Sequence, residues 1–313
     1  MIIATHSGRF HADDAWAVMV LDKVFPENDL LRTRDLALIE RADFAVDVGG
    51  AWDPQRGRFD HHQKEFDIAR PSGVAYASAG LVWREFGARC VALLAQELLQ
   101  QALSPEQAAQ IAAAIDSDLV QYLDMADTGA ARNAPGSYGL SALVSGFNPT
   151  WLDEARMAAD GAENIEQLRL AQFRRVMAML GDVLENAVRF RVSGMLAHER
   201  VRCARQLEDG RLLYLENGAL PWSYVVRTEM PRVLFVIGYD RNEDRYILHT
   251  VPAAADSFVA RKDLPASWSG LQGEQLARVT GVADAGFCHR NLFIASAGSW
   301  DGVLRMARQA IDS

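Results

Sequence analysis

The chain is poor in cysteine and has no excess of positive charge. Its 313 residues include three cysteines, Cys90, Cys203 and Cys288, which are scattered and show no C-x-x-C spacing. This pattern excludes a disulfide framework, disfavours a structural zinc site and favours a reducing compartment. The formal net charge of -9 argues against a broad basic face for long nucleic-acid duplexes, because such binding uses many lysines and arginines to neutralise phosphates. Short or small anionic substrates stay compatible with this charge.

Long apolar runs and low-complexity segments are also missing. No window approaches the roughly 18 uninterrupted apolar residues that suggest a membrane-spanning helix. The start, MIIATHSGRFHADDAW, turns polar after five residues and lacks the order of a signal peptide. Half of the residues are hydrophobic and no internal repeat is visible, so the whole chain reads as globular. We therefore expect a cytoplasmic protein without membrane association, long enough for two domains.

Strand and helix signals alternate in the first part of the chain, which favours a parallel sheet flanked by helices. We predict helices at 12–25 and 36–41, and strands at 1–5, at 30–33 and in FAVDVGG, which ends at Asp47. The first helix carries apolar residues at the spacing of an amphipathic helix. In parallel sheets ligands bind beyond the carboxyl ends of the strands, where His6 and Asp47 both fall.

The later pattern is first helical and then rich in β-strand signals. We predict helices at 75–101, 104–127 and 163–186, with a loop at 128–139 before a further helical region. Beyond about Phe190 short β-rich segments take over, and RVLFVIGYD followed by RYILHTVP is typical of a hairpin. The prediction is an α/β protein: an N-terminal domain over 1–188 that includes the long helix, and a smaller C-terminal α+β domain over 189–313.

Histidine and aspartate gather near the predicted strand ends. Of the seven histidines, four lie at or just past a predicted strand end: His6, His11, His61 and His62. The accompanying aspartates are Asp13, Asp14, Asp47 and Asp60, and then Asp116, Asp118, Asp124 and Asp127 on or ending a helix. Mixed imidazole and carboxylate ligands suit Mn²⁺, Fe²⁺, Co²⁺ or Zn²⁺. Two such ions bridged by one carboxylate would clamp the attacking and leaving oxygens of a phosphoryl transfer.

The same residues have structural alternatives. Asp13 and Asp14 suit the first turn of a helix through its dipole, and a histidine pair is compatible with a surface loop. On an extended segment two adjacent side chains point to opposite sides, so at most one of His61 and His62 easily serves a given face of a site. The order of the candidates favours a site, since they follow strand one, strand three, the next loop and a later helix.

Several stretches resemble a known family. THSGRFHADDAWA, RTRD, VDVGGAWDPQRGRFDHHQKEF, SAGLVWREFG and DMADTG are similar to the MYG family, a branch of the DHH phosphoesterase superfamily. Further matches include NPTW, LPWS, LPASWSGL, FCHRNLFIA and GVLRMARQA, so the resemblance runs nearly end to end. It implies a DHH-type metal-binding domain and a two-metal phosphodiesterase that uses Mn²⁺, with eukaryotic members acting as 3′ to 5′ RNA exonucleases. An older description as a metal-dependent protein hydrolase fits less well, because the superfamily acts on phosphates.

The resemblance also implies a role for each motif residue. The metal ligands would be His6, His11, Asp13, Asp47, His61 and Asp127, with Asp47 as the bridge. His62 would contact the substrate phosphate, and Asp60 would orient an imidazole.

The chain departs from the expected pattern at two of these positions and leaves one ligand open. His11 stands where superfamily members often carry aspartate, and Asp14 stands where relatives commonly have glutamate, which leaves Asp14 at the helix start. Asp124 lies one helical turn before Asp127, so the sequence leaves open which of them is the ligand on the helix.

Three further residues are candidates for substrate binding. His289 matches a family histidine, whereas Arg290 replaces a small residue of the family pattern and is chemically apt beside a phosphate. The alternative for His289 is a histidine hydrogen-bonded inside a β-hairpin. Arg34 suits either a phosphate contact or a solvated charge.

Three functions compete at this stage. The first is a metal-dependent phosphodiesterase, a 3′ to 5′ exonuclease on RNA or short oligonucleotides with a water activated by two ions. The second is a phosphoesterase on a small nucleotide or dinucleotide, which the acidic charge favours. The third is a metal- or nucleotide-binding module without turnover. The oligomeric state stays open, with a homo-oligomer among the alternatives.

Overall fold

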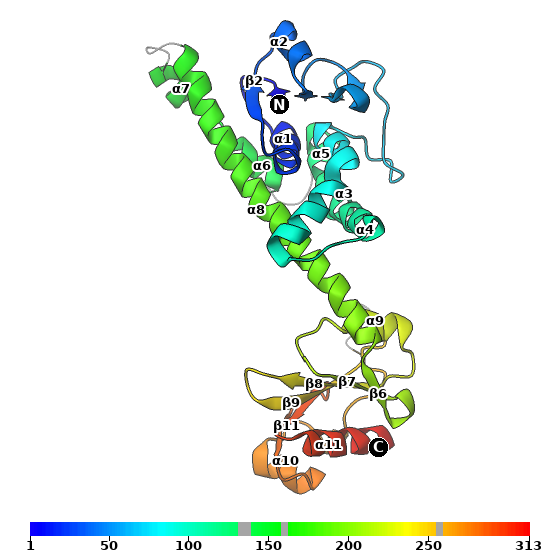
Figure 1. Cartoon of the computed structure of the whole chain (residues 1–313). Coiled ribbons are helices and arrows are strands. Elements are labelled where there is room, and N and C mark those ends of the chain that lie inside the picture. Colours follow the sequence, from blue (N-terminus) through cyan, green and yellow to red (C-terminus); the bar gives the residue numbers. More distant parts are fainter. Residues whose placement is uncertain (131–138, 158–161, 255–258) are drawn as a thin grey trace. The chain divides into compact units, whose positions relative to one another are not determined.

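The structure is a computed structural model that describes residues 1–130, 139–157, 162–254 and 259–313 (Figure 1). The chain divides into two compact units, Met1–Val192 and Ser193–Ser313. Each unit contains one sheet with helices, and the first sheet is mainly parallel. The predicted α/β class is therefore confirmed.

The first unit is built on a five-stranded sheet. Its order is β2 (Asp29–Arg32), β1 (Ile2–Thr5), β3 (Phe44–Val46), β5 (Arg58–Phe59) and β4 (Trp52–Asp53). All neighbours pair in parallel except β4, which runs antiparallel to β5. A 3₁₀ turn at Pro54–Arg56 joins these last two strands, which the sequence did not predict. The carboxyl ends of β1, β3 and β5 consequently meet at one edge.

Helices cover both faces of this sheet. On one face Ile39 of α2 (Leu36–Arg41) packs on Ala45 of β3. On the other, α1 (Ala12–Val24) packs against both the sheet and α3 (Ser78–Leu99), with the Trp16 and Trp83 rings 5.9 Å apart. The sequence predicted an amphipathic helix here, but every residue of α1 except Asp22 and Lys23 is buried.

The helix predicted at 104–127 has three parts. It comprises α4 (Pro105–Ile115), a π-helical segment at Asp116–Val120, and α5 (Gln121–Asp127). Ser104 and Gln107 form a reciprocal capping box at its start. Two short helices follow, α6 (Leu140–Ser145) and α7 (Trp151–Met157). Residues 131–138 of the predicted loop lie outside the described residues.

The long helix α8 (Ala162–Arg202) ends well beyond the predicted 186, so the expected change to β-structure near Phe190 was wrong. The reason is a stripe of fully buried residues that continues at helical spacing through the predicted end: Phe173, Val176, Leu180, Leu184, Val188 and Val192. The division between the two units falls inside this helix, after Val192.

The second unit is built on a six-stranded sheet. Its order is β10 (Ala285–Cys288), β11 (Ile294–Ala297), β9 (Arg245–Thr250), β8 (Phe235–Asp240), β7 (Leu212–Leu215) and β6 (Arg205–Leu207). The antiparallel pair β8 and β9 confirms the predicted hairpin. One sheet face packs on α11 (Trp300–Asp312) and α10 (Gly273–Thr280), and the other on α9 (Ser223–Glu229). Short 3₁₀ turns lie at Glu208–Gly210 and Ala266–Trp268.

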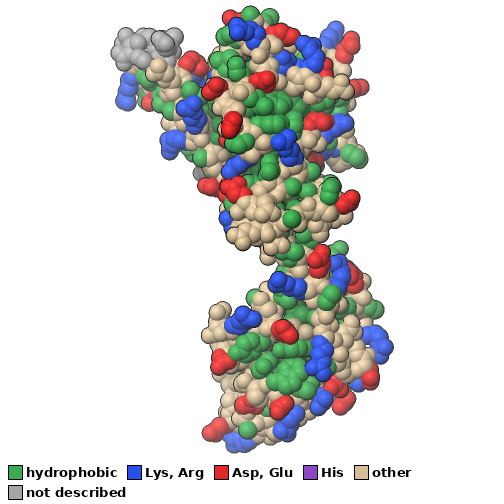
Figure 2. All heavy atoms as spheres, viewed as in Figure 1, with side chains coloured by type: hydrophobic (Ala, Val, Ile, Leu, Met, Phe, Trp, Pro, Cys, Tyr) green, Lys and Arg blue, Asp and Glu red, His purple; other side chains and the backbone are tan. Residues whose placement is uncertain are grey.

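The distribution of charge on the surface and the character of the helices match what the composition predicts. Basic and acidic side chains are interspersed on the face of each unit drawn in Figure 2, as an acidic chain without a basic patch predicts. No helix within the described residues has the length and apolar character needed to cross a membrane.

Candidate metal centre

Asp47 follows β3 in an unusual backbone conformation. Its φ of 53° lies in the left-handed region, which residues with a side chain rarely adopt. The two following glycines at positive φ, Gly49 and Gly50, continue the turn, and the Asp47 amide donates to the Phe59 carbonyl at 3.1 Å. Such strain persists only where the surroundings fix it, and it clusters at functional sites.

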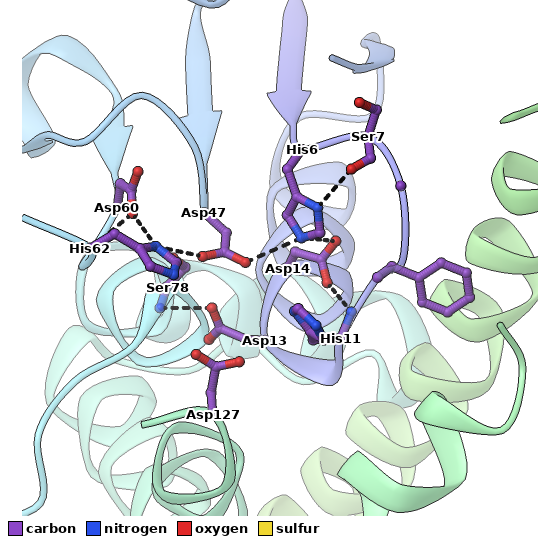
Figure 3. Close-up of polar contacts among 12 residues, drawn as sticks. His6, Ser7, His11, Asp13, Asp14, Asp47, Asp60, His62, Ser78 and Asp127 are labelled. Carbon is purple, nitrogen blue, oxygen red and sulfur yellow. Dashed lines mark hydrogen bonds and ion pairs between the residues drawn. The ribbon is translucent and has the colours of Figure 1, made fainter. Parts of the chain in front are cut away.

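Both carboxylate oxygens of Asp47 contact histidines (Figure 3). Oδ2 lies 3.4 Å from His6 Nε2, at the end of β1. Oδ1 lies 3.5 Å from His61 Nε2 and 3.4 Å from His62 Nδ1, just past β5. Asp47 therefore connects two clusters of candidate ligands.

The first cluster consists of His6, His11, Asp14 and Asp47, whose nearest donor atoms all lie within 4.8 Å of one another. Asp14 Oδ2 is 3.4 Å from His6 Nε2, while Asp14 Oδ1 accepts a 2.7 Å hydrogen bond from the His11 amide. Asp14 thus stands at the helix start, as expected, but it also faces the cluster. The family resemblance assigns no ligand role to Asp14, although its place beside Asp13 and near the histidines was a signal in the sequence.

The second cluster consists of Asp13, His61 and Asp127, and a further group of Asp47, His61 and His62 links it to Asp47 through His61. His61 Nε2 lies 3.2 Å from Asp127 Oδ2 and 3.9 Å from Asp13 Oδ2. The Asp13 carboxylate accepts hydrogen bonds from the amides of Ser78 at 3.1 Å and Ala79 at 2.6 Å, in the first turn of α3. The unpaired amides and the dipole of a helix N-terminus stabilise a carboxylate in this position.

The two helix-borne aspartates have different surroundings. Asp127 faces His61, whereas Asp124 is fully buried, accepts a 2.9 Å hydrogen bond from the Gly80 amide and lies 2.7 Å from Arg70. The geometry therefore favours Asp127 as the candidate ligand. Arg70 did not emerge from the sequence because it stands in no quoted motif, and Gly80 lies in the matched stretch SAGLVWREFG but has no side chain that would suggest a role.

The expected separation of His61 and His62 to opposite sides was wrong. Their rings lie 4.4 Å apart and both approach Asp47. The strand β5 ends at Phe59, and Asp60 Oδ1 then accepts hydrogen bonds from both the amide (3.0 Å) and Nδ1 (2.8 Å) of His62, which turns the ring inward. The two side chains still differ in exposure, at 10% for His61 and 62% for His62.

Polar atoms in the clusters lack hydrogen-bond partners among the described residues. Those that are buried and face the centre are His6 Nε2, Asp14 Oδ2, Asp47 Oδ1 and His61 Nε2. Buried polar groups are rarely left unpaired, because desolvation without compensation is costly. Unpaired nitrogen and oxygen atoms that converge within a few ångströms fit divalent cations of the Mn²⁺, Fe²⁺, Co²⁺ and Zn²⁺ type.

The pKa shifts of the buried groups reflect the crowding of carboxylates in the two clusters. Burial raises the pKa of Asp14 to about 7 and, together with the nearby Asp47 charge, raises the pKa of Asp13 well above its usual range. For Asp47, burial opposes ionisation, but the contacts with His6 and His61 hold the pKa far below its usual value. Burial disfavours the cationic form of His61, yet Asp127 and Asp47 raise its pKa to about 10. Crowded buried carboxylates of this kind are stabilised by cations.

The three predicted substrate-binding residues lie in different places. Arg34 Nη2 is 3.3 Å from His6 Nδ1, at the exposed edge of the first cluster. His289 and Arg290 lie in the second unit, in the turn between β10 and β11. There His289 Nδ1 accepts a 3.1 Å hydrogen bond from the Asn291 amide, as in the hairpin alternative. Their substrate contacts stay predictions.

The fold and the clusters together define an α/β protein with a candidate metal centre at the carboxyl edge of a mainly parallel sheet. The chain belongs to the family whose model is MYG1_exonuc, described as an uncharacterised protein family (UPF0160), which matches residues 2–311. This match confirms the resemblance found in the sequence.

Named relatives cover nearly the whole chain. It is 30% identical to the human MYG1 exonuclease over 99% of this chain and 85% of the human protein. The rat MYG1 exonuclease is 32% identical over 99% and 84% of the two chains, and the MYG1 protein of Chlamydia pneumoniae is 25% identical over 94% and 90%. These matches support the prediction of a hydrolytic enzyme of the nuclease type.

Among solved structures, RecJ of Thermus thermophilus in complex with Mn²⁺ matches with a TM-score of 0.26 and 14% identity. The alignment covers all of this chain and 52% of RecJ, so the chain spans about half the length of that protein. The TM-score is too low to define a common fold.

Proposed function

We propose that this chain is a metal-dependent phosphodiesterase that removes nucleotides from the 3′ end of short RNA with the help of two Mn²⁺ ions. The observation that carries the proposal is Asp47, whose two oxygens contact histidines of two separate ligand clusters. The exonuclease names of the relatives support a nucleic-acid substrate. The cysteine content supports work in the cytoplasm.

The residues around Asp47 divide into two ligand sets. His6, His11 and Asp14 would hold one ion with Asp47, while Asp13, His61 and Asp127 would hold the other. Mixed imidazole and carboxylate donors without cysteine suit Mn²⁺ along with Fe²⁺, Co²⁺ and Zn²⁺, and the family resemblance favours Mn²⁺ among them. When bound, the ions would supply an activated water and Lewis-acid stabilisation of the phosphate oxygens.

Two other residues would act on the substrate itself. His62 is more than half exposed, and its Nδ1 is engaged by the buried carboxylate of Asp60, which leaves Nε2 for a phosphate oxygen. Asp60 is itself fixed by a 2.6 Å hydrogen bond from the Gly50 amide, so it holds the imidazole in one orientation. Arg34 at the edge of the first cluster would add a planar positive donor for a second phosphate oxygen.

The acidic net charge favours a second candidate function, hydrolysis of a small phosphate ester. A net charge of -9 gives little long-range attraction for a long polyanion, so a dinucleotide or another small phosphate ester is the next substrate class. A binding module without turnover is the third, and multiple turnovers on any substrate would exclude it.

The direct test is a metal-dependent activity assay. With Mn²⁺, we expect the purified protein to release nucleoside monophosphates from a short oligoribonucleotide, and chelation by EDTA to stop the reaction. An oligonucleotide labelled at its 5′ end should shorten stepwise if digestion begins at the 3′ end. Release of mononucleotides from a dinucleotide alone would favour the second candidate. Absence of turnover on both substrates with Mn²⁺, Mg²⁺ and Co²⁺ would leave only the binding module.

A further prediction concerns the second unit. We expect His289→Ala to lower kcat/KM by roughly ten- to a thousandfold, the range for loss of a positioned donor, and to leave metal content unchanged. Arg290→Lys would show whether a planar guanidinium matters more than its charge. Elemental analysis and circular dichroism control for metal and fold. Wild-type kinetics in His289→Ala, on a substrate that the native enzyme turns over, would leave this histidine with its hairpin role.

A further inference from the structure

Arg70 is a buried arginine that lies outside both ligand clusters and connects two parts of one helix. Its guanidinium donates two hydrogen bonds to Asp116, from Nε at 2.7 Å and Nη2 at 2.6 Å. Nη1 lies 2.7 Å from Asp124, and the guanidinium lies over the Tyr76 ring at 4.1 Å. Asp116 opens the π-helical segment, whereas Asp124 lies beyond it in α5. One guanidinium therefore binds the helix on both sides of that segment.

The π-helical segment decides which way α5 faces. A π turn contains an extra residue, and one residue corresponds to about 100° of rotation around a helix axis. The residues after Asp116–Val120 are therefore rotated relative to an uninterrupted helix, and in this orientation Asp127 reaches His61. A contact that fixes both sides of the segment fixes this rotation.

The same network reaches Asp13 through the first turn of α3. The Gly80 amide donates to Asp124, and the two preceding amides donate to Asp13. A Cβ added at Gly80 would lie 1.9 Å from Asp124 Oδ2 and 2.6 Å from Arg70 Nη2, so only glycine fits. Two members of the second cluster, Asp13 and Asp127, are thus placed by elements that meet at Arg70 and Asp124.

We propose that Arg70 is a positioning residue for the second ligand cluster, the one formed by Asp13, His61 and Asp127. It acts through Asp116 and Asp124, which hold the π-helical segment and the start of α3. The inference rests on the proposed two-metal function. It goes beyond that function because the affinity for one ion would depend on Arg70, a residue that belongs to neither ligand cluster.

The test is metal binding by Arg70→Met, which keeps the length and apolar stem of the side chain but removes its donors. In isothermal titration of the metal-free full chain with Mn²⁺, we expect the native protein to bind two ions. In Arg70→Met one of them should bind about ten- to a hundredfold more weakly, the usual effect of removing a group that supports metal ligands. The other ion, held by the first cluster, should bind as in the native protein.

Three further variants sharpen the result. Asp116→Asn weakens the interaction of Arg70 with Asp116 and leaves the one with Asp124. Because the Asp116 carboxylate is partly exposed, this variant still measures the affinity for the same ion if Arg70→Met does not fold. Arg70→Lys keeps the charge without the two-pronged geometry and should restore binding only in part. The matched control is Arg58→Met, since Arg58 is also buried but donates to the Ala42 and Glu40 carbonyls at 3.1 and 3.0 Å. Arg58→Met should bind both ions with the affinity of the native protein.

The outcomes separate this inference from the proposed function. If Arg70→Met and Asp116→Asn bind both ions equally more weakly, or bind both as tightly as the native protein, Arg70 has no such positioning role. The two-metal function would be unaffected by either result. A native protein that binds no Mn²⁺ would overturn both. Unchanged circular dichroism in the variants ensures that a lost ion does not reflect a lost fold.

Discussion

Replacing Asp47 by alanine is expected to remove bound metal and to lower kcat/KM by roughly 10⁴-fold or more, as loss of a central catalytic group does in other hydrolases. The reason is that Asp47 contacts His6 at 3.4 Å and His61 at 3.5 Å with different oxygens, so the first cluster loses a candidate ligand and the second loses the carboxylate beside His61. Elemental analysis of the purified variant and steady-state kinetics with a short oligoribonucleotide measure the two effects.

Two variants define the origin of this loss. Asp47→Asn keeps the shape of the side chain and tolerates the left-handed backbone, so it isolates the negative charge from the strain at φ 53°. Asp29→Ala removes an exposed carboxylate from β2, the edge strand of the same sheet, and should have no effect. Unchanged metal content in Asp47→Ala would contradict its assignment as the bridge.

The second large effect is a difference in kind between the two adjacent histidines. His61→Ala should lose one metal ion and nearly all turnover, because His61 Nε2 lies among Asp13, Asp47 and Asp127. His62→Ala should retain both ions and lose about 10²- to 10⁴-fold in kcat, the range for a positioned proton donor or acceptor. Metal content and kcat, measured on the same preparations, distinguish the variants.

The proximity of His62 to Asp47 makes this a demanding test. Its Nδ1 lies 3.4 Å from Asp47 Oδ1 but 2.8 Å from Asp60 Oδ1, so the hydrogen bond to Asp60 competes with any metal for that nitrogen. Asp60→Asn should reproduce part of the kinetic loss without loss of metal. If His62→Ala loses as much metal as His61→Ala, then His62 is a ligand and the division of labour is wrong.

The edge on which the site lies could be predicted because the strands themselves carry the signal. Short apolar runs stop at Thr5 and Val46, and the next residues are His6 and Asp47, so a parallel sheet brings them together. The hairpin of β8 and β9 was equally visible, since two β-rich runs flank a short polar turn. These features depend on local pattern and on one general rule of sheet topology.

What the sequence did not reveal depends on contacts between distant residues. The strands β4 and β5 have two residues each, too few to show a periodic pattern. The π-helical segment has helical composition, and only the contacts of Arg70 with Asp116 and Asp124 distinguish it. The inward turn of His62 likewise follows from its hydrogen bonds to Asp60 rather than from any preference of adjacent histidines.

The continuity of α8 has a consequence for how such a protein can change. Its 41 residues run without a break across the division between the units, so no loop offers a natural point of cleavage or gene fusion there. Cutting the chain near Val192 would leave helical carbonyls and amides without partners at the end of the row of buried side chains from Phe173 to Val192. Exchange of the second unit by recombination would therefore need a crossover that preserves helical phase, whereas most modular proteins recombine through flexible linkers.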